Sequence, residues 1–276
     1  MSTYRNGVLL NRARLLVTGQ TTSYVDYDDG YYEKGMAKSY TVFTAGTFSG
    51  TTTIDLTHLV STHIAFVKGT PDTLTSDTTD FTTLFVAGDV IPVSGSPTPG
   101  NNIAHTIAAG GVAAGTITLT SSNVLTSEVE GASITIKKRE AHSNACVLDN
   151  NTGLMWSQTV VGKMGPASDG KLPWTTISGY GIFPYVLAVN AALLGGYGDW
   201  RSPNIDELSS IINYGLNPAR PNTIAFPSFP TGKVWTNTTY EQDNTFAWQL
   251  NSGYPGDLGL NDSKTLNAFI ILVRGG

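Results

Sequence analysis

Hydrophobic and polar positions alternate in short runs through the first half of this chain, in a pattern typical of strands. These runs lie at 64–67, 81–86, 90–93, 116–119 and 133–136. Turn clusters rich in Gly and Pro separate them, at 69–72, 87–89, 94–100 and 110–111. The spacing predicts a small β-sandwich or β-barrel. Pro92 lies within one run and predicts an edge strand there, because proline cannot donate a ladder hydrogen bond.

Two segments in the second half carry apolar residues at helical spacing. The first covers residues 183–194 and is followed by a glycine pair at 195–196, which is typical of a helix end. The second begins at Asn204, a good N-cap residue, and Glu207 three positions later completes a capping box. We expect this second helix to end at Gly215. Its expected apolar face consists of Ile205, Leu208, Ile211 and Ile212.

Composition and charge narrow the class of protein. The chain has 276 residues, of which 40% are hydrophobic and 13% charged, as in a globular protein. Its net charge of −5 argues against nucleic-acid binding, because no basic stripe displaces counterions. No apolar run approaches the ~18 residues that span a bilayer, and no secretory signal is evident. We therefore expect synthesis in a cytoplasm and no membrane insertion, the alternative being a chain whose leader was removed.

Four sequence blocks follow one another towards the C-terminus. They read C-V-L-D-N-N-T-G-L-M-W at 146–156, G-D-W-R-S-P-N-I-D-E-L at 198–208, V-W-T-N-T-T at 234–239 and V-R-G-G at 273–276. Their order closely resembles the C-type-lectin-like domain at the C-terminus of Lcl, a collagen-like bacterial adhesin, and of related bacterial and phage proteins. The resemblance implies an α+β fold, with two helices on a twisted antiparallel sheet, that displays a variable binding surface. It does not imply an enzyme, and we expect none.

The N-terminal segment resembles the leader of the same family, in T-G-Q-T at 18–21 and D-D-G at 28–30. In the family the leader passes quickly into the first block, whereas a long β-rich stretch intervenes here. Residues 51–54 and 134–137 look like the two halves of one interrupted junction, and the ends of an insertion must lie close together. A continuous N-terminal β domain without an insertion is the alternative. The expected parts are 1–54, the leader part of the lectin-like domain; 55–133, an inserted β domain; and 134–276, the lectin-like core with its binding loops.

Several residues that could act as catalytic groups are better explained as structural. Asp206 and Glu207 are adjacent in the first turn of the expected second helix, where they suit the helix dipole and point apart. Trp200 and Arg201 are assigned to the internal framework, because a buried indole needs a hydrogen-bond partner and Arg can bridge to a carboxylate. The resemblance implies the same role for Trp156, Trp235 and Arg274.

No cofactor or metal is expected. The four histidines, His58, His63, His105 and His142, lack the close spacing of a local zinc motif. A single cysteine, Cys146, excludes an internal disulfide. It also argues against the formylglycine-generating enzymes, which have a related fold and use paired cysteines. Calcium stays open at two clusters of oxygen ligands. These clusters are 149–151, for which a turn is favoured, and 261–262.

The polar loops after Trp235 are the expected binding surface. They are rich in Tyr, Asn, Asp, Thr and Ser, which suit an adaptable recognition surface, although ordinary solvated loops are the alternative. We expect Trp235, Trp248 and a strand at 268–273 to support these loops from beneath. The expected ligand-binding residues are Asn237, Thr239, Tyr240, Glu241, Asp243, Asn244, Tyr254, Asp257, Asn261, Asp262 and Lys264.

Together these features indicate a non-enzymatic binding protein. We expect a phage receptor-binding or tail-fibre protein on the virion surface that recognises a host glycan or surface protein. The alternative is a bacterial cell-surface adhesin or structural surface module, and a glycan hydrolase comes third. We also expect a homotrimer, which gains avidity from several weak sites, and contacts with other virion proteins. Lectin-like domains of this kind also serve as variable proteins of diversity-generating retroelements, whose mutated codons yield Asn, Asp, Ser, Thr and Tyr.

Overall fold

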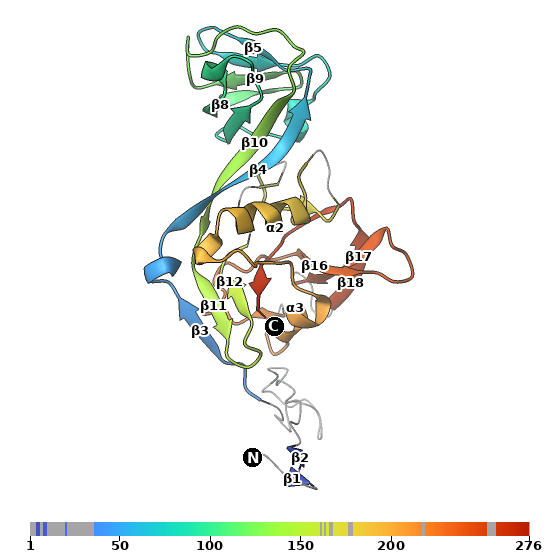
Figure 1. The fold of residues 1–276 in the computed structure, drawn as a ribbon. Coiled ribbons are helices and arrows are strands. Elements are labelled where there is room, and N and C mark those ends of the chain that lie inside the picture. The colour runs from blue at the N-terminus through green and yellow to red at the C-terminus, as the bar shows by residue number, and fades with distance from the viewer. Residues whose placement is uncertain are drawn as a thin grey trace.

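A computed structural model gives the fold of the chain (Figure 1). It describes residues 4–5, 8–9, 20, 36–160, 162, 164–165, 168–175, 179–216, 219–252 and 258–275. Apart from Gln20, the leader motifs at 18–21 and 28–30 lie outside these residues. In Figure 1 a β module stands at one end of the molecule, and a long two-stranded ribbon joins it to a larger part that carries both helices.

The predicted α+β lectin-like fold class is wrong, because the protein is mostly β. Strands account for 39% of the residues and helices for 12%, and a large curled sheet dominates the molecule. The two described α-helices are short: α2 is Ile182–Ala191 and α3 is Ile205–Ser210. By contrast, three strands have ten residues or more: β4 (Thr51–Ser61), β8 (Ala104–Ala113) and β10 (Ile134–Ser143). The sequence patterns located the helices but gave no measure of how far these strands extend.

The curled sheet has seven antiparallel strands in the order β4-β10-β7-β8-β9-β6-β5. Its shorter strands are β5 (Ala65–Val67), β6 (Thr73–Thr75), β7 (Val90–Ser94) and β9 (Thr116–Leu119). Short 3₁₀ turns accompany the strands: η1 (Gly46–Phe48), η2 (Phe81–Thr83) and η3 (Pro99–Asn101). The predicted runs at 64–67, 90–93, 116–119 and 133–136 are therefore confirmed as strands, or as the start of one.

The run at 81–86 is not a strand. The carboxylate of Asp80 accepts a hydrogen bond from the Thr82 amide at 3.0 Å and begins η2. Phe81, Leu84 and Phe85 are all buried. Their spacing suits a helical turn, which buries positions i, i+3 and i+4 together. An apolar run this short does not distinguish a strand from a helical turn.

The edge prediction for Pro92 is also wrong, since β7 lies between β10 and β8. Pro92 pairs with Ala104 of β8. On the other side, the pairing of β7 with β10 includes Val93 and Val90 but skips Pro92. An interior strand therefore accommodates the proline at a gap in its ladder, where no amide donor is needed.

Strands β4 and β10 form the ribbon that leads from the larger part into the β module (Figure 1). Ile54 pairs with Glu140, and Ile134 pairs with Ser61. Ile54 and Ile134, the predicted ends of the junction, are thus at opposite ends of the ladder and not side by side. The division into a lectin-like domain and an insertion stays a prediction.

Buried polar contacts join the β module to the larger part of the molecule. His58 of β4 contacts the backbone carbonyl of Met164 through Nε2 at 2.8 Å. On β10, the ammonium of Lys138 lies 3.1 Å from Asp89 of the module and donates to the carbonyl of Gly165 at 2.7 Å. The side chains of His58 and Lys138 are almost fully buried. These contacts fix the orientation of the ribbon, because breaking them would leave a buried polar group without a partner.

A four-stranded antiparallel sheet forms one side of the larger part. Its order is β20 (Val273–Arg274), β12 (Met155–Ser157), β11 (Cys146–Asp149) and β3 (Tyr40–Phe43). Shorter pairs are β1 (Tyr4–Arg5) with β2 (Val8–Leu9), β13 (Leu172–Pro173) with β19 (Asn267–Ala268), and β14 (Ile212–Asn213) with β15 (Arg220–Pro221). Residues 268–273, predicted as one strand, are buried except for the half-buried Phe269, but only their ends are strand.

The segment before β3 is fastened by the turn that follows β11. The Asn151 side chain accepts from the Ser39 amide at 2.8 Å and donates to the Ala37 carbonyl at 2.9 Å. Asp149 accepts from the Asn151 amide at 2.9 Å, which confirms the predicted turn. The ammonium of Lys38 donates to the carbonyl of Ser210, the last residue of α3, and to that of Ile212 just beyond it. Burial lowers the pKa of this lysine to about 8.

Both predicted helices are confirmed, but α3 ends at Ser210 and not at Gly215 as predicted, and Ile212, expected on its apolar face, belongs to strand β14. Helix α2 ends close to the glycine pair, where η4 (Leu194–Gly196) follows it. Helix α3 begins with the predicted capping box, in which Asn204 Oδ1 accepts from the Glu207 amide and Glu207 Oε2 accepts from the Asn204 amide, each at 2.8 Å. No helix among the described residues is long and apolar enough to cross a membrane.

The motif residues form an internal framework, as predicted. Arg201 holds Glu207 through two hydrogen bonds, at 2.7 and 2.6 Å. Arg274 holds Asp199 in the same way, at 2.6 and 3.1 Å. The buried indoles of Trp200 and Trp235 donate to the carbonyls of Leu194 and Leu172. Trp156 is also fully buried, but its indole N–H has no partner among the described residues.

Candidate binding surface

A three-stranded antiparallel sheet projects from the side of the molecule (Figure 1). It consists of β16 (Lys233–Thr239), β17 (Phe246–Asn251) and β18 (Leu258–Ser263). The turn between β16 and β17 is closed by a backbone hydrogen bond from Tyr240 to Phe246 at 3.0 Å. Within the turn, Asp243 Oδ1 accepts from both the amide and the hydroxyl of Thr245, at 2.9 and 2.6 Å. A structured hairpin, and not a loose loop, therefore carries the predicted site.

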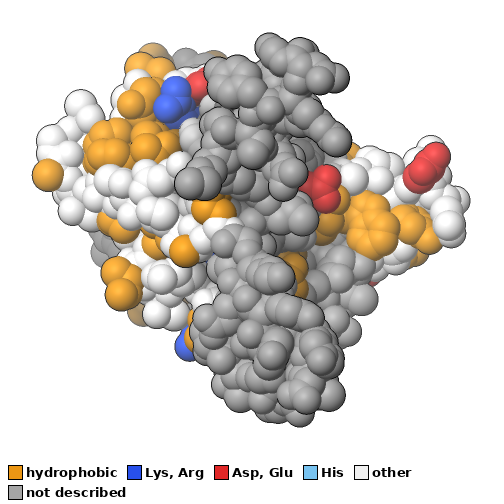
Figure 2. Space-filling model, turned by 90° about the horizontal axis from the view of Figure 1, so that it is seen from below, with side chains coloured by type: hydrophobic (Ala, Val, Ile, Leu, Met, Phe, Trp, Pro, Cys, Tyr) orange, Lys and Arg blue, Asp and Glu red, His pale blue; other side chains and the backbone are white. Residues whose placement is uncertain are grey.

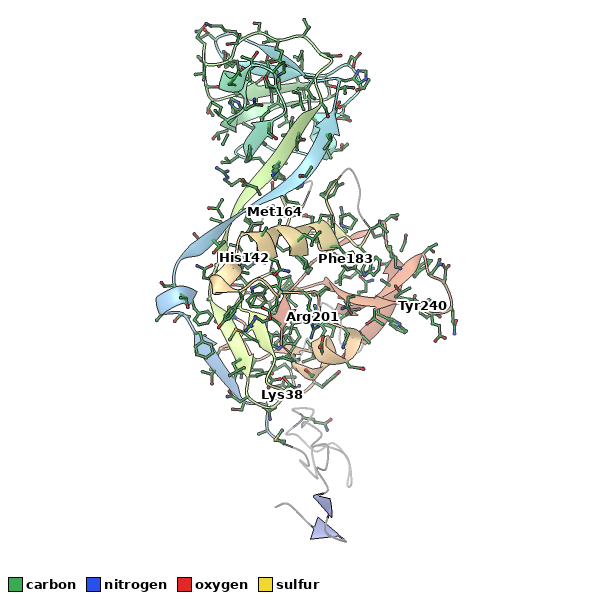
Figure 3. The ribbon with its side chains drawn as sticks, in the orientation of Figure 1. Lys38, His142, Met164, Phe183, Arg201 and Tyr240 are labelled. Carbon is green, nitrogen blue, oxygen red and sulfur yellow. The ribbon has the colours of Figure 1, made fainter. Side chains whose placement is uncertain are left out.

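One face of this hairpin carries a pair of half-exposed aromatic rings. Tyr240 and Trp248 meet edge to face, with centroids 5.4 Å apart and planes at 82°. The Tyr240 hydroxyl donates to Gln242 at 2.7 Å, and Trp248 pairs across the sheet with the exposed Asn261. Figure 3 shows Tyr240 on the projecting hairpin, and Figure 2 shows hydrophobic side chains on the underside of this projection. Aromatic groups held in fixed positions next to water suit ligand binding.

The opposite face of the hairpin is fastened to the body by Lys264. Its ammonium donates to Thr239 Oγ1 at 3.0 Å and to the Asn244 carbonyl at 2.8 Å. It also lies 3.9 Å from the centre of the Trp174 ring. Lys264 is only 8% exposed. These contacts make it a support for the hairpin and leave little of it for a ligand.

Two more predicted residues are engaged within the protein. Asp262 accepts from Lys233 at 2.5 Å and from Gln249 at 3.0 Å, which ties the three strands together. Asn237 is exposed, but its side-chain amide donates to the Ser202 carbonyl at 3.1 Å, beside the start of α3.

The end of the hairpin is acidic. Glu241 and Asp243 are both exposed there, and Figure 2 shows acidic side chains at the far end of the projection. The hydroxyl and amide of Thr245 lower the pKa of Asp243, so its carboxylate stays charged. Among the described residues of this sheet, the nearby lysines already have partners: Lys233 pairs with Asp262, and Lys264 donates to the carbonyl of Asn244. The face offered to a ligand thus combines aromatic rings with negative charge.

The structure divides the predicted site residues into three groups. Five residues lie on the accessible surface of the sheet that forms the hairpin: Tyr240, Glu241, Asp243, Asn244 and Asn261. Four others make contacts within the protein that position the hairpin: Asn237, Thr239, Asp262 and Lys264. Tyr254 and Asp257 lie outside the described residues.

Trp248 is the residue whose role the sequence prediction missed. It was expected to support the loops from beneath, but it is half-exposed beside Tyr240. The signal was present in the alternation of β17, where the half-exposed Phe246 and Trp248 flank the buried Ala247. Trp235 does lie beneath, fully buried, as predicted.

Cys146 is poorly suited to act as a nucleophile. The thiol is buried and donates to the Asn144 carbonyl. Burial raises its pKa to about 12, and a protonated thiol is a poor nucleophile.

The internal framework thus carries an aromatic hairpin at the surface of the molecule. Residues 145–274 match the family described as the Lcl C-terminal domain, which confirms the resemblance predicted from the four sequence blocks. This match marks that part of the chain as an adhesin-like surface module. The seven-stranded sheet, from β4 to β10, lies entirely before the matched residues. Comparisons with curated proteins and with solved structures gave no match.

Proposed function

We propose that this protein is a non-enzymatic receptor-binding protein whose β16–β17 hairpin recognises a glycan or protein on a host surface. The observation that carries the proposal is the half-exposed pair of Tyr240 and Trp248 on a hairpin anchored by Lys264. Rigid aromatic side chains bind with little loss of conformational entropy, and planar rings suit stacking on apolar faces of a ligand. The acidic end of the hairpin adds a preference for ligands with cationic or hydrogen-bond-donating groups.

We propose a phage virion as the setting, with the protein as part of a tail fibre that is made in the host cytoplasm. Association into a homotrimer would place several hairpins side by side and raise avidity. The Asn, Asp, Thr and Tyr codons of the hairpin would also suit a retroelement variable protein. A bacterial cell-surface adhesin is the second candidate, and the match to the Lcl C-terminal domain favours it.

The test compares Tyr240→Ala with Tyr214→Ala. Tyr214 is 42% exposed and follows β14, away from the hairpin, so it is a matched control. Labelled protein is applied to a panel of bacterial cells and to a glycan array. Tyr240→Ala should reduce binding by ~1–3 kcal/mol with an unchanged melting temperature, whereas Tyr214→Ala should bind like the unmodified protein.

Treating the cells separates the two kinds of receptor. Periodate should abolish binding to a glycan, and protease should abolish binding to a protein. Tyr240→Ala binding at full strength would place the site elsewhere. Loss of glycan mass during incubation would instead indicate an enzyme.

A further inference from the structure

Three side chains from separate segments of the β module converge on one point. His63 follows β4, Asp77 follows β6, and Glu130 precedes β10. His63 Nδ1 lies 3.0 Å from Asp77 Oδ1 and 3.6 Å from Glu130 Oε2. One ligand atom from each residue lies within 4.8 Å of the other two. The three residues are distant in sequence, so no local spacing motif predicts the cluster.

The backbone around the cluster is held by its own hydrogen bonds. The His63 amide donates to Ser61 Oγ at 3.0 Å, and the Gly131 amide donates to the Thr62 carbonyl at 2.8 Å. Ser76, next to Asp77, donates its amide to the Gly115 carbonyl at 3.0 Å. The segments that carry the three ligands are therefore fixed independently of an ion, and little order has to be created when one binds.

The chemistry of the cluster favours a divalent cation. In its neutral form, His63 Nδ1 carries at most one proton, so it can donate to only one of the two carboxylates. The contacts that the described residues give to the side chains of Asp77 and Glu130 are those with His63. Two negative charges thus converge on one imidazole nitrogen. A divalent cation in their midst would neutralise both and accept the nitrogen lone pair.

The separations of the ligand atoms also suit a metal ion. Ligands about 2.1 Å from an ion, at tetrahedral or octahedral angles, lie about 3.0–3.4 Å apart. The two contacts of His63, at 3.0 and 3.6 Å, lie close to this range. One imidazole with two carboxylates suits zinc and similar transition metals, whereas calcium prefers a full set of oxygen ligands.

We propose that His63, Asp77 and Glu130 form a divalent transition-metal site on the β module, with Zn²⁺ as the ion to test first. The bound ion would link the segments after β4, after β6 and before β10. It would stabilise the module, because a ligand that binds only the folded state shifts the equilibrium towards that state. The proposal does not depend on the function of the hairpin.

The remaining histidines make the test specific. His58, His105 and His142 are 0%, 4% and 2% exposed, and Cys146 is fully buried. His63 is therefore the exposed imidazole among the four histidines of the chain. A full-length protein without an affinity tag offers Zn²⁺ few competing sites.

The experiment is calorimetric titration of chelator-treated protein with ZnCl₂ at neutral pH, alongside MnCl₂ and CaCl₂. We expect one Zn²⁺ per chain and a rise in melting temperature. His63→Ala and Asp77→Asn should each weaken binding at least about tenfold, since even mutations outside the ligand sphere commonly have such effects. Glu241→Gln on the distant hairpin is the matched control and should bind like the unmodified protein.

Since His63 and Asp77 are exposed, both variants should fold, and circular dichroism checks this. Two results would overturn the proposal. One is the absence of Zn²⁺ binding, which would leave His63 as the proton-bearing partner of an ion pair. The other is binding of any of these ions that is unchanged by His63→Ala.

Discussion

The imidazole of His58 lies flat against the ring of Tyr180, with centroids 4.9 Å apart and planes at 4°. His58 belongs to β4, and Tyr180 lies two residues before the start of α2. The stacked pair therefore joins the β ribbon to the larger part of the molecule, beside the contact of His58 with Met164.

Acid should destabilise the protein through His58. Burial lowers the pKa of His58 to about 4, from 6.5 when the chain is unfolded. The unfolded chain therefore takes up the proton first, so the contribution of His58 to stability is complete above pH 6.5 and is lost as the pH falls towards 4. The loss amounts to about 3 kcal/mol. Urea unfolding from pH 7.5 to 4 measures it.

His58→Gln should be less stable at pH 7.5 but should lose less stability towards pH 4. Tyr214→Ala is the control and should keep the pH dependence of the unmodified protein, because burial raises the pKa of Tyr214 above its usual range and the phenol does not titrate between pH 4 and 7.5. Equal slopes in His58→Gln and the unmodified protein would show that another group is responsible.

Removing the N-cap of α3 should weaken the fold by about 1 kcal/mol. Asn204→Ala loses the bond from the Glu207 amide, whereas the neighbouring Asp206 is exposed and takes no part in the capping box. Asp206→Ala should therefore change the free energy of unfolding by less than about 0.5 kcal/mol. Equilibrium unfolding of both variants decides the matter, and equal effects would contradict the assignment of the cap to Asn204.

Features determined by neighbouring residues could be predicted from the sequence. The capping box needs only Asn204 and Glu207, three positions apart, and it formed as expected. The framework around Arg201 and Arg274 followed from the motif blocks and the need of buried charges for partners. Tyr240 was predicted in a polar surface loop, and it does lie at the surface, although on the structured hairpin of β16 and β17 and not in a loose loop.

Features that depend on distant pairing could not be predicted. The extended β4–β10 ladder, which shifts the fold class towards β, joins segments far apart in the chain. Pro92 was predicted at an edge. The sequence does not show that the pairing of β7 with β10 has a gap at this proline, which allows it an interior position. Lys264 looked like a ligand contact, since the sequence does not show that Trp174 lies beside its ammonium.

A shortened protein tests whether the β module is an insertion. Ser61 and Ile134 pair across the ladder, so an Asn-Gly turn can join them and replace residues 62–133. Lys138→Met accompanies the deletion, because removing Asp89 takes away the carboxylate that lies 3.1 Å from this buried ammonium. The product should be soluble and melt cooperatively, at a lower temperature than the full chain. An insoluble product would favour a continuous domain over an insertion.

Replacing Lys264 should separate support of the hairpin from contact with a ligand. Lys264→Met keeps the apolar stem but loses the bonds to Thr239 and Asn244 and the charge above Trp174. Hydrogen bonds from a charged donor contribute about 1.5–3 kcal/mol, and Lys264→Met removes two of them. The variant should therefore melt at a lower temperature and also bind host cells more weakly, because the hairpin moves. Tyr240→Ala should weaken binding alone. Thermal unfolding and cell binding are measured for both variants, and a Lys264→Met protein that loses binding without losing stability would make Lys264 a ligand contact after all.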